Sequence, residues 1–394
     1  MDHSSNNGTV RFSNILEEVF IMSFMRLPVT PDLEGTALGQ HLERQLGDRR
    51  AFLRRATALG LALPALAAAA YPVVAQHEHE ATPPVPEDGD GYVGSDASTS
   101  DDTGDSTPVP QSPTAHTVYD PVLAPVESGP KDFTVVAKDT TVFVAKDTPY
   151  AGWTFDDTIP GRTLRVVEGD TVTMTVRNEG AIMHSLDTHA AKTSPELNYR
   201  NLESGEEFTW NFVATTPGAF MYHCGTPPVL LHIGAGMYGA MIVNPKEGWS
   251  PAQELIFVQS EFYFEDADAP VMSPSMTKMM FASGMMMDGV AFNGYLNQYV
   301  ENPIAVKVGE PIRIFVVNAG PNVWSSFHVV GAIFDRVCVN ANPRNELFGL
   351  QSVSIGPGDG ACVEFTLEEP GTYVAVNHSF GHAAHGAIAL LQAE

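Results

Sequence analysis

The stretch Val166–Asn178, VVEGDTVTMTVRN, decides the fold of this 394-residue chain. A β-branched run meets a turn at Glu168-Gly169-Asp170, and a second β-branched run follows. Short runs of this kind, without long helical periodicity around them, are typical of a Greek-key sandwich or barrel. The pattern returns at Val306–Asn318, VKVGEPIRIFVVN, where Gly309 takes the place of Gly169. The sequence therefore predicts an all-β protein with two similar units.

The chain divides into four parts around these two stretches. Residues 131–247 are predicted to form the first β domain and residues 248–394 the second, with the junction near Pro245–Pro251. Each of these two β domains is long enough to bury a core of its own. Residues 76–130 are predicted to be an acidic disordered linker, because they are rich in Asp, Ser, Thr, Pro and Gly and poor in large apolar groups.

Residues 1–75 form an N-terminal extension that contains an export signal. Arg49 and Arg50 precede an apolar stretch of about fifteen residues, from Ala56 to Ala70, which small residues follow. A membrane span needs about twenty apolar residues, so a cleaved twin-arginine signal is favoured over a permanent anchor. We expect export to the periplasm or to the outer face of the membrane.

The charge of the chain excludes one class of partner. Asp and Glu number 47 against 21 Lys and Arg, which gives a net charge of −26. Nucleic acid and anionic membrane surfaces would repel such a protein, so we expect no nucleic-acid partner. A strongly acidic, lysine-poor chain suits a protein kept soluble in concentrated salt, and an acidic secreted protein is the alternative.

A set of copper ligands lies at the end of the first domain. Cys224 is followed by His232 after eight residues and by Met237 after five more, and His184 lies upstream. One Cys, two His and one Met are the ligands of a mononuclear blue copper centre. The three cysteines of the chain cannot form a disulfide framework, and the odd count leaves at least one thiol free for a metal.

Strand alternation sorts the neighbouring histidines into two groups. Adjacent residues of a strand point to opposite faces, so His223 and Cys224 diverge. One consistent partition sends His184 and Cys224 inward and sends Asp187, His189 and His223 outward. Two outward histidines beside a carboxylate make half of a second metal site, which lacks at least one protein ligand, and that ligand must come from elsewhere.

At this point the motifs resemble a known family. His184-x-x-Asp187-x-His189, then His223-Cys224, His232 and Met237 in a duplicated cupredoxin chain, are similar to copper-containing nitrite reductase, shorter-loop branch, over residues 131–394. The resemblance implies two tandem cupredoxin-like domains, a homotrimer, and two copper ions per subunit. It implies the following ligands: His184, Cys224, His232 and Met237 for the type 1 copper, and His189, His223 and a neighbouring subunit's His378 for the type 2 copper.

The resemblance also implies an activity, a substrate pocket and a donor. Nitrite is reduced to nitric oxide and water, with Asp187 and His328 as catalytic residues that supply protons and Val330 shaping the substrate pocket. Electrons come from a small blue copper protein or a cytochrome. The third type 2 ligand could also be His382 or His385, which follow His378 closely.

Two other functions use related sequences. A blue copper electron carrier needs the type 1 ligands but not Asp187, His189 or His328. A multicopper oxidase has a trinuclear centre that needs His-x-His pairs and a His-Cys-His run, and residues 131–394 contain neither.

Two smaller features complete the sequence. The Met-rich segment 272–287 is predicted to be a helix that packs over the second domain, with a copper-loading loop as the alternative. Cys338 and Cys362 are predicted to be buried thiols, although export permits a disulfide between them.

Overall fold

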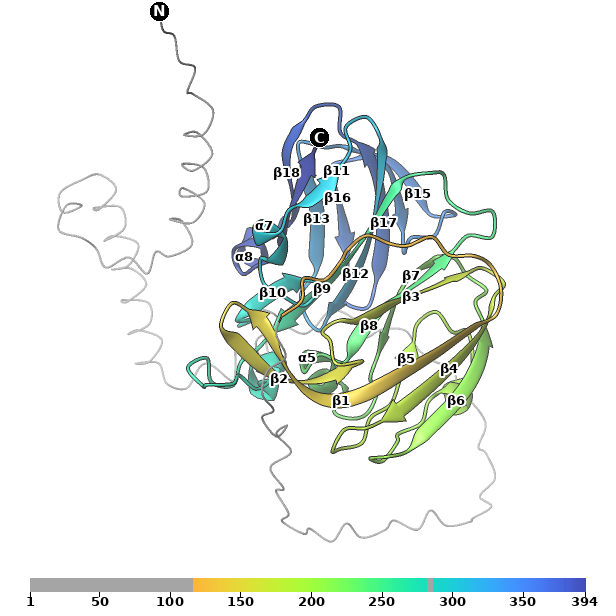
Figure 1. The fold of residues 1–394 in the computed structure, drawn as a ribbon, viewed down its shortest axis with the longest axis vertical. Helices are drawn as coiled ribbons and strands as arrows, with labels where there is room; N and C mark the ends of the chain where they lie inside the picture. Colours follow the sequence, from red (N-terminus) through yellow and green to blue (C-terminus); the bar gives the residue numbers. More distant parts are fainter. Residues whose placement is uncertain (1–115, 282–285) are drawn as a thin grey trace, which may run out of the picture. The chain divides into compact units, whose positions relative to one another are not determined.

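The computed structural model describes residues 116–281 and 286–394, which form a mostly β structure (Figure 1). The prediction of an all-β fold is confirmed. The twin-arginine signal and residues 76–115 of the linker lie outside the described residues. In the two described ranges, no helix is long and apolar enough to cross a membrane.

The first sandwich consists of two four-stranded sheets, with strand orders β2-β1-β4-β6 and β3-β8-β7-β5. Its strands are β1 (Lys131–Ala145), β2 (Thr148–Phe155), β3 (Gly161–Val167), β4 (Thr171–Asn178), β5 (Asp187–Thr188), β6 (Glu207–Val213), β7 (Gly218–His223) and β8 (Tyr238–Asn244). It also contains two short helices, α4 (Pro195–Asn198) and α5 (Val229–Gly234). β1 pairs in parallel with β4, so two strands that are not consecutive in the chain are neighbours in the first sheet.

The second sandwich repeats this arrangement with a six-stranded and a five-stranded sheet, ordered β10-β9-β12-β17-β14-β15 and β11-β19-β18-β13-β16. Its strands are β9 (Gln253–Phe262), β10 (Gly289–Phe292), β11 (Ile304–Val306), β12 (Pro311–Gly320), β13 (Ser325–Val330), β14 (Phe334–Val339), β15 (Glu346–Leu350), β16 (Ser352–Ile355), β17 (Gly360–Thr366), β18 (Gly371–Asn377) and β19 (Ile388–Ala393). Three short helices accompany them: α6 (Met276–Phe281), α7 (Gln298–Glu301) and α8 (Phe380–Ala384).

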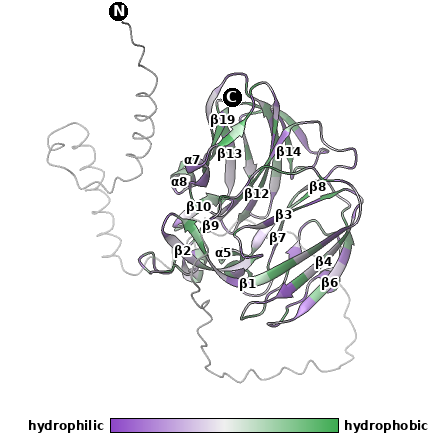
Figure 2. Cartoon of the chain, in the orientation of Figure 1, coloured by the Kyte–Doolittle hydropathy of each residue, from purple (hydrophilic) through white to green (hydrophobic). Residues whose placement is uncertain are grey.

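Alternating side chains build the core of each sandwich. In β6, Trp210 and Phe212 are buried, whereas Thr209 and Asn211, which alternate with them along the strand, are exposed. The alternation of hydropathy along β4 and β6 is visible in Figure 2. This period of two residues is the pattern of a sheet with one face against a core.

The duplicated stretches adopt the same local structure. Gly169 and Gly309 both have positive φ, at 98° and 74°, in the turns that precede β4 and β12. Asn178 ends β4, and its Nδ2 donates to the carbonyls of Ile182 and Leu202 at 2.7 and 2.9 Å. Asn318 in β12 makes the same kind of bonds: its Nδ2 donates to the carbonyls of Val323 and Ile355 at 2.8 and 3.0 Å. The sequence repeat is therefore a repeat of a hydrogen-bonded corner.

A shared apolar layer joins the two sandwiches. Ala219, Met221 and Ile242 of the first sandwich belong to the same buried cluster as Ile256 and Phe315 of the second. Each of these residues is at most 2% exposed. The two sandwiches are therefore one packed body rather than two domains on a flexible hinge.

Ion pairs reinforce this junction. The guanidinium of Arg313, whose side chain is 2% exposed, binds Glu254 at 2.8 Å and Glu364 at 2.6 Å. Glu254 also binds Arg165 of β3, so the network reaches from the second sandwich into the first. Every charge in it has a partner, as buried charges require.

Residues 116–130 differ from the expected disordered linker. Leu123 N donates to Glu254 O at 2.9 Å, and Gly129 N donates to Asp170 Oδ1 at 2.7 Å. Tyr119 Oη bonds Thr163 Oγ1 at 2.9 Å. Tyr119 and Leu123 also pack on the apolar layer between the sandwiches. The polar composition of the segment indicated that the entropy lost on ordering would keep it disordered, but this burial offsets that loss.

The Met-rich segment also differs from its expected position. It contains a helix, α6, but Met279 packs with Leu230 and Leu231 of the first sandwich, not only over the second. Residues 282–285 lie outside the described residues. Cys338 and Cys362 are buried free thiols that face each other across β14 and β17, and burial raises the pKa of Cys338 to about 11.

Candidate metal centres

The first cluster is buried in the first sandwich. The ligand atoms of His184, Cys224 and His232 all lie within 4.8 Å of one another, and the three residues are at most 2% exposed. Cys224 directly follows β7, and His232 lies in α5. His184 is held by backbone bonds to Leu202, whose N donates to His184 O at 2.8 Å. Three separate segments thus converge on one point.

Met237 closes the loop that carries two of these residues. Cys224 N donates to Met237 O, and Met237 N donates to His232 O, both at 3.1 Å. Met237 is fully buried in the core of the first sandwich. The loop from Cys224 to Met237 therefore carries a thiol, an imidazole and a thioether in one short, hydrogen-bonded segment.

The donor set of this cluster fits copper. Neither ring nitrogen of His184 has a hydrogen-bond partner, although both are buried. An unpaired buried polar group is costly, and a metal bond would remove that cost. Burial lowers the pKa of His184 to about 3, so its imidazole is neutral and can offer a lone pair. The soft sulfur and imidazole ligands are those that copper prefers.

The surroundings of the cluster hold it in place. The ring of Trp153 lies 4.7 Å from the His232 ring and 5.7 Å from the His184 ring, centroid to centroid. Ser185 N lies 3.4 Å from Cys224 Sγ, where it can donate to a thiolate. An apolar cover and a fixed donor are the features by which a protein tunes a copper potential.

The second cluster lies on the outer side of the same strand. The ligand atoms of Asp187, His189 and His223 are also within 4.8 Å of one another. Asp187 of β5 pairs with His223 of β7, and His189 N donates to Met221 O at 3.0 Å. His189 is exposed and the other two are half-buried. His223 and Cys224, which are adjacent in the sequence, therefore belong to different clusters.

The two histidines of this cluster aim their Nε2 atoms at each other. His189 Nδ1 lies 3.2 Å from Gly358 O, and His223 Nδ1 lies 2.9 Å from Cys224 O. Carbonyl oxygens only accept, so each Nδ1 carries the proton and each Nε2 of a neutral ring presents a lone pair. The two Nε2 atoms are 3.2 Å apart. Two lone pairs at this distance repel unless a cation lies between them, and nitrogens bound to one ion at about 2.0–2.1 Å can have this separation.

Two histidines of the second sandwich form a separate pair. The rings of His328 and His378 lie 5.5 Å apart, and His378 N donates to Ser326 O at 2.7 Å. His378 is exposed, and Val330, on the same strand as His328, is 47% exposed. Among the described residues of one chain, neither histidine belongs to the metal-binding group of Asp187, His189 and His223.

Sequence reasoning missed the contact of Gly358 with His189. Gly358 belongs to the second sandwich and has a φ of 84°, which an L side chain rarely adopts. A Cβ at this position would lie 3.4 Å from His189 Cε1. The motif Gly356-Pro357-Gly358 signals a turn, but its contact with a histidine 169 positions away is a tertiary feature.

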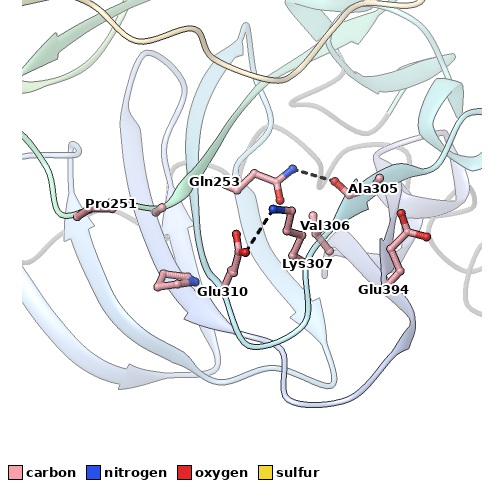
Figure 3. A pocket seen from close by; sticks show the side chains of 9 residues that line it. Pro251, Gln253, Ala305, Val306, Lys307, Glu310 and Glu394 are labelled. Carbon is pink, nitrogen blue, oxygen red and sulfur yellow. Dashed lines mark hydrogen bonds and ion pairs between the residues drawn. The ribbon is translucent and has the colours of Figure 1, made fainter.

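A cleft of about 620 Å³ lies elsewhere on the second sandwich (Figure 3). Gln253, Lys307, Glu310 and Glu394 are among the residues that line it, and none of its lining residues belongs to either cluster. Lys307 and Glu310 pair with each other at 3.3 Å. The cleft offers no group suited to redox chemistry, so we assign the chemistry to the histidine clusters.

The fold and the buried Cys-His-Met site define a copper protein of the two-domain cupredoxin class. The family model described as "Multicopper oxidase" matches residues 136–248, within the first sandwich.

Individual relatives narrow this class. A copper-containing nitrite reductase of Neisseria meningitidis is 37% identical over 264 residues, which cover 65% of this chain and 67% of the relative. The solved structure of a copper nitrite reductase from Nitrosomonas europaea matches with 37% identity and a TM-score of 0.63, over 68% of this chain and 94% of that one. A copper-containing nitrite reductase from Thermus scotoductus matches with 34% identity and a TM-score of 0.62, over 67% and 62% of the two chains. This chain belongs to the family of copper-containing nitrite reductases.

Proposed function

We propose that this protein reduces nitrite to nitric oxide and water, consuming one electron and two protons. The observation that carries the proposal is the divergence of His223 and Cys224 into two clusters, because consecutive residues then link two metal centres through one peptide unit. Copper bound by these two clusters would supply the one-electron redox chemistry and an open position for nitrite.

The proposed type 1 centre uses His184, Cys224, His232 and Met237. Their burial excludes water, which keeps the thiolate and the imidazoles in a fixed arrangement. The proposed type 2 centre uses His189 and His223, whose Nε2 atoms already face one point. Each chain would hold one copper ion of each type.

His378 of a neighbouring chain is the proposed third ligand of the type 2 centre. Its exposure and its separation from the His189 group within one chain favour an assembly in which the second sandwich of one subunit covers the first sandwich of another. The resemblance to nitrite reductases implies a homotrimer. Exposed apolar side chains near His378, at Trp324 and Phe380, support burial of this face, since they are 62% and 61% exposed in the single chain.

Asp187 and His328 are the proposed proton donors. Asp187 lies beside His223 on the face where nitrite would bind. His328 accompanies His378 from the neighbouring chain, and its Nδ1 faces Gln351 O, which leaves Nε2 free to reach substrate. Val330 would contribute an apolar wall next to His328.

The donor and the location follow from the same proposal. A small blue copper protein or a cytochrome would deliver electrons at the type 1 centre. Arg49, Arg50 and the apolar stretch that follows would direct export by the twin-arginine route, which carries folded proteins.

The test is electron paramagnetic resonance and metal analysis of the copper-loaded protein, combined with detection of nitric oxide in the presence of a one-electron donor. We expect two copper ions per chain, one blue and one type 2 signal, and release of nitric oxide. A single cupric environment in fully loaded material, without nitric oxide, would contradict the proposal.

The family model that matches residues 136–248 makes a multicopper oxidase the second candidate, although residues 131–394 lack the His-x-His pairs and the His-Cys-His run of a trinuclear centre. Four copper ions per chain and oxygen consumption would support it. One copper ion per chain, without turnover, would instead indicate an electron carrier.

A further inference from the structure

The last residue of α5, Gly234, is covered by the end of the Met279 side chain. A Cβ at Gly234 would lie 2.3 Å from Met279 Sδ and 2.4 Å from Met279 Cε. Real Cβ atoms do not approach other atoms so closely, so the thioether rests directly on the backbone of the helix. His232, a proposed type 1 ligand, lies two residues before Gly234 in the same helix.

Met279 belongs to the second sandwich and is fixed there. It is 2% exposed, and its carbonyl accepts from Asn322 Nδ2 at 3.2 Å. Asn322 N in turn donates to Glu261 Oε1 at 3.0 Å, and Glu261 is a buried residue of β9. In the same helix, Lys278 pairs with Asp288 at 3.0 Å. Met279 is therefore not a loose surface side chain that happens to touch α5.

The other side of α5 is held by the first sandwich. Tyr150 Oη donates to Gly234 O at 2.8 Å, and Trp153 N donates to Ala235 O at 3.1 Å. The segment before α6 also reaches β2, because Met272 N donates to Pro149 O at 2.9 Å. The end of α5 thus lies between β2 on one side and Met279 on the other.

Any shift of α5 moves the His232 imidazole. The ring nitrogen Nδ1 of His232 lies 3.1 Å from the carbonyl oxygen of Pro228, the N-cap residue of α5, so the ring is tied to the first turn of the helix. The ring also packs against Trp153 of β2. We infer that Met279 is a positioning residue for the type 1 centre: it presses on Gly234 and so sets where His232 stands relative to Cys224. This inference deepens the proposed function and rests on it.

The test is the copper affinity and the visible absorption of the type 1 centre in four variants. Partners that hydrogen-bond a ligand directly typically change metal affinity about 10–100-fold when removed, and Met279 acts through one more residue, so the lower end of this range applies. We expect Met279→Ala to lower type 1 copper affinity about tenfold, measured by competition with a chelator, and to change the relative intensities of the thiolate-to-copper bands. Gly234→Ala should do the same, because the added Cβ displaces either Met279 or the helix.

Two variants act as controls. Met279→Leu fills a similar volume and should keep the wild-type affinity and spectrum. Met280→Ala changes a residue of the same helix that is 57% exposed, and it should also behave as wild type. If Met279→Ala does not fold, Gly234→Ala alone decides the question, and wild-type affinity and spectrum in that variant would overturn the positioning role.

The outcomes separate the two proposals. Wild-type affinity and spectrum in both Met279→Ala and Gly234→Ala would overturn the positioning role while leaving the nitrite reductase proposal intact. If the wild-type protein binds no copper in a type 1 site, the proposed function itself is contradicted, and the positioning role of Met279 falls with it.

Discussion

Gly358 O of the second sandwich lies 3.2 Å from Nδ1 of His189 in the first. A backbone carbonyl of one sandwich therefore fixes the tautomer of a proposed ligand in the other. Outer partners of this kind orient metal-binding histidines in many proteins.

Gly358→Ala should disturb the type 2 centre alone. The φ of 84° disfavours any side chain by about 1–2 kcal/mol, and relief of this strain would move the carbonyl away from His189. Gly349→Ala is the matched control, because Gly349 has a φ of 70° and no atom near its Cβ position. We expect both variants to lose similar stability, and only Gly358→Ala to lose type 2 copper in metal analysis. Equal type 2 occupancy in the two variants would remove Gly358 from the site.

Cys224→Ala should abolish the blue absorption and donor-driven turnover, since it removes the thiolate of the type 1 centre. Cys338→Ala, which removes a buried thiol outside both clusters, should keep the colour. Absorption spectra and steady-state turnover check both variants. Blue colour in the Cys224→Ala protein would rule out the assigned ligand.

Asp187→Asn should leave both copper ions bound and lower turnover about a hundredfold or more, on the usual scale of acid–base contributions. Metal content and nitric oxide production are measured on the same preparation. Unchanged turnover would mean that Asp187 does not supply a proton.

Mixing variants should test whether His378 acts in a neighbouring chain. His378→Ala and His189→Ala chains should each be inactive alone. Co-assembled from a mixture, some sites combine an intact His189 with an intact His378, so part of the activity should return. A mixture of His189→Ala with His223→Ala chains carries both defects in the first sandwich and should recover nothing. Recovery in neither mixture would contradict a shared site.

Glu261→Gln should change how stability depends on pH. Burial raises the pKa of Glu261 above its ordinary value of 4.5. Between pH 4.5 and the raised pKa of the folded state, the folded chain keeps a proton that the unfolded chain releases. Glu261 therefore makes the free energy of unfolding fall as pH rises through this range. The variant has no such proton, so its stability relative to wild type should rise with pH, by at most about 1.4 kcal/mol per pH unit. Urea unfolding across pH checks this, with exposed Glu265→Gln as control; a constant difference between Glu261→Gln and wild type would contradict it.

Local pattern predicted a large part of the fold. The turn glycines at 169 and 309 both have positive φ in the structure, as their matching places in the repeat suggested. Period-two alternation placed His223 and Cys224 on opposite faces, and one is half-buried while the other is fully buried. Such predictions succeed because they depend on residues a few positions apart.

Contacts between distant segments could not be predicted in the same way. Met279 touches Gly234 from another sandwich, and a Met-rich run in a sequence indicates only flexible apolar packing. The order of the stretch around Tyr119 could not be predicted either, because its polar composition does not reveal the apolar layer against which it packs. Each depends on surfaces that exist only after folding.

The apolar layer between the sandwiches has a consequence for any attempt to divide the molecule. Separating the halves would expose Met221, Ile242, Ile256 and Phe315 to water at once. A protease cut in the connector of residues 245–252 should therefore leave a nicked protein whose fragments stay together, and neither fragment should be soluble when produced alone.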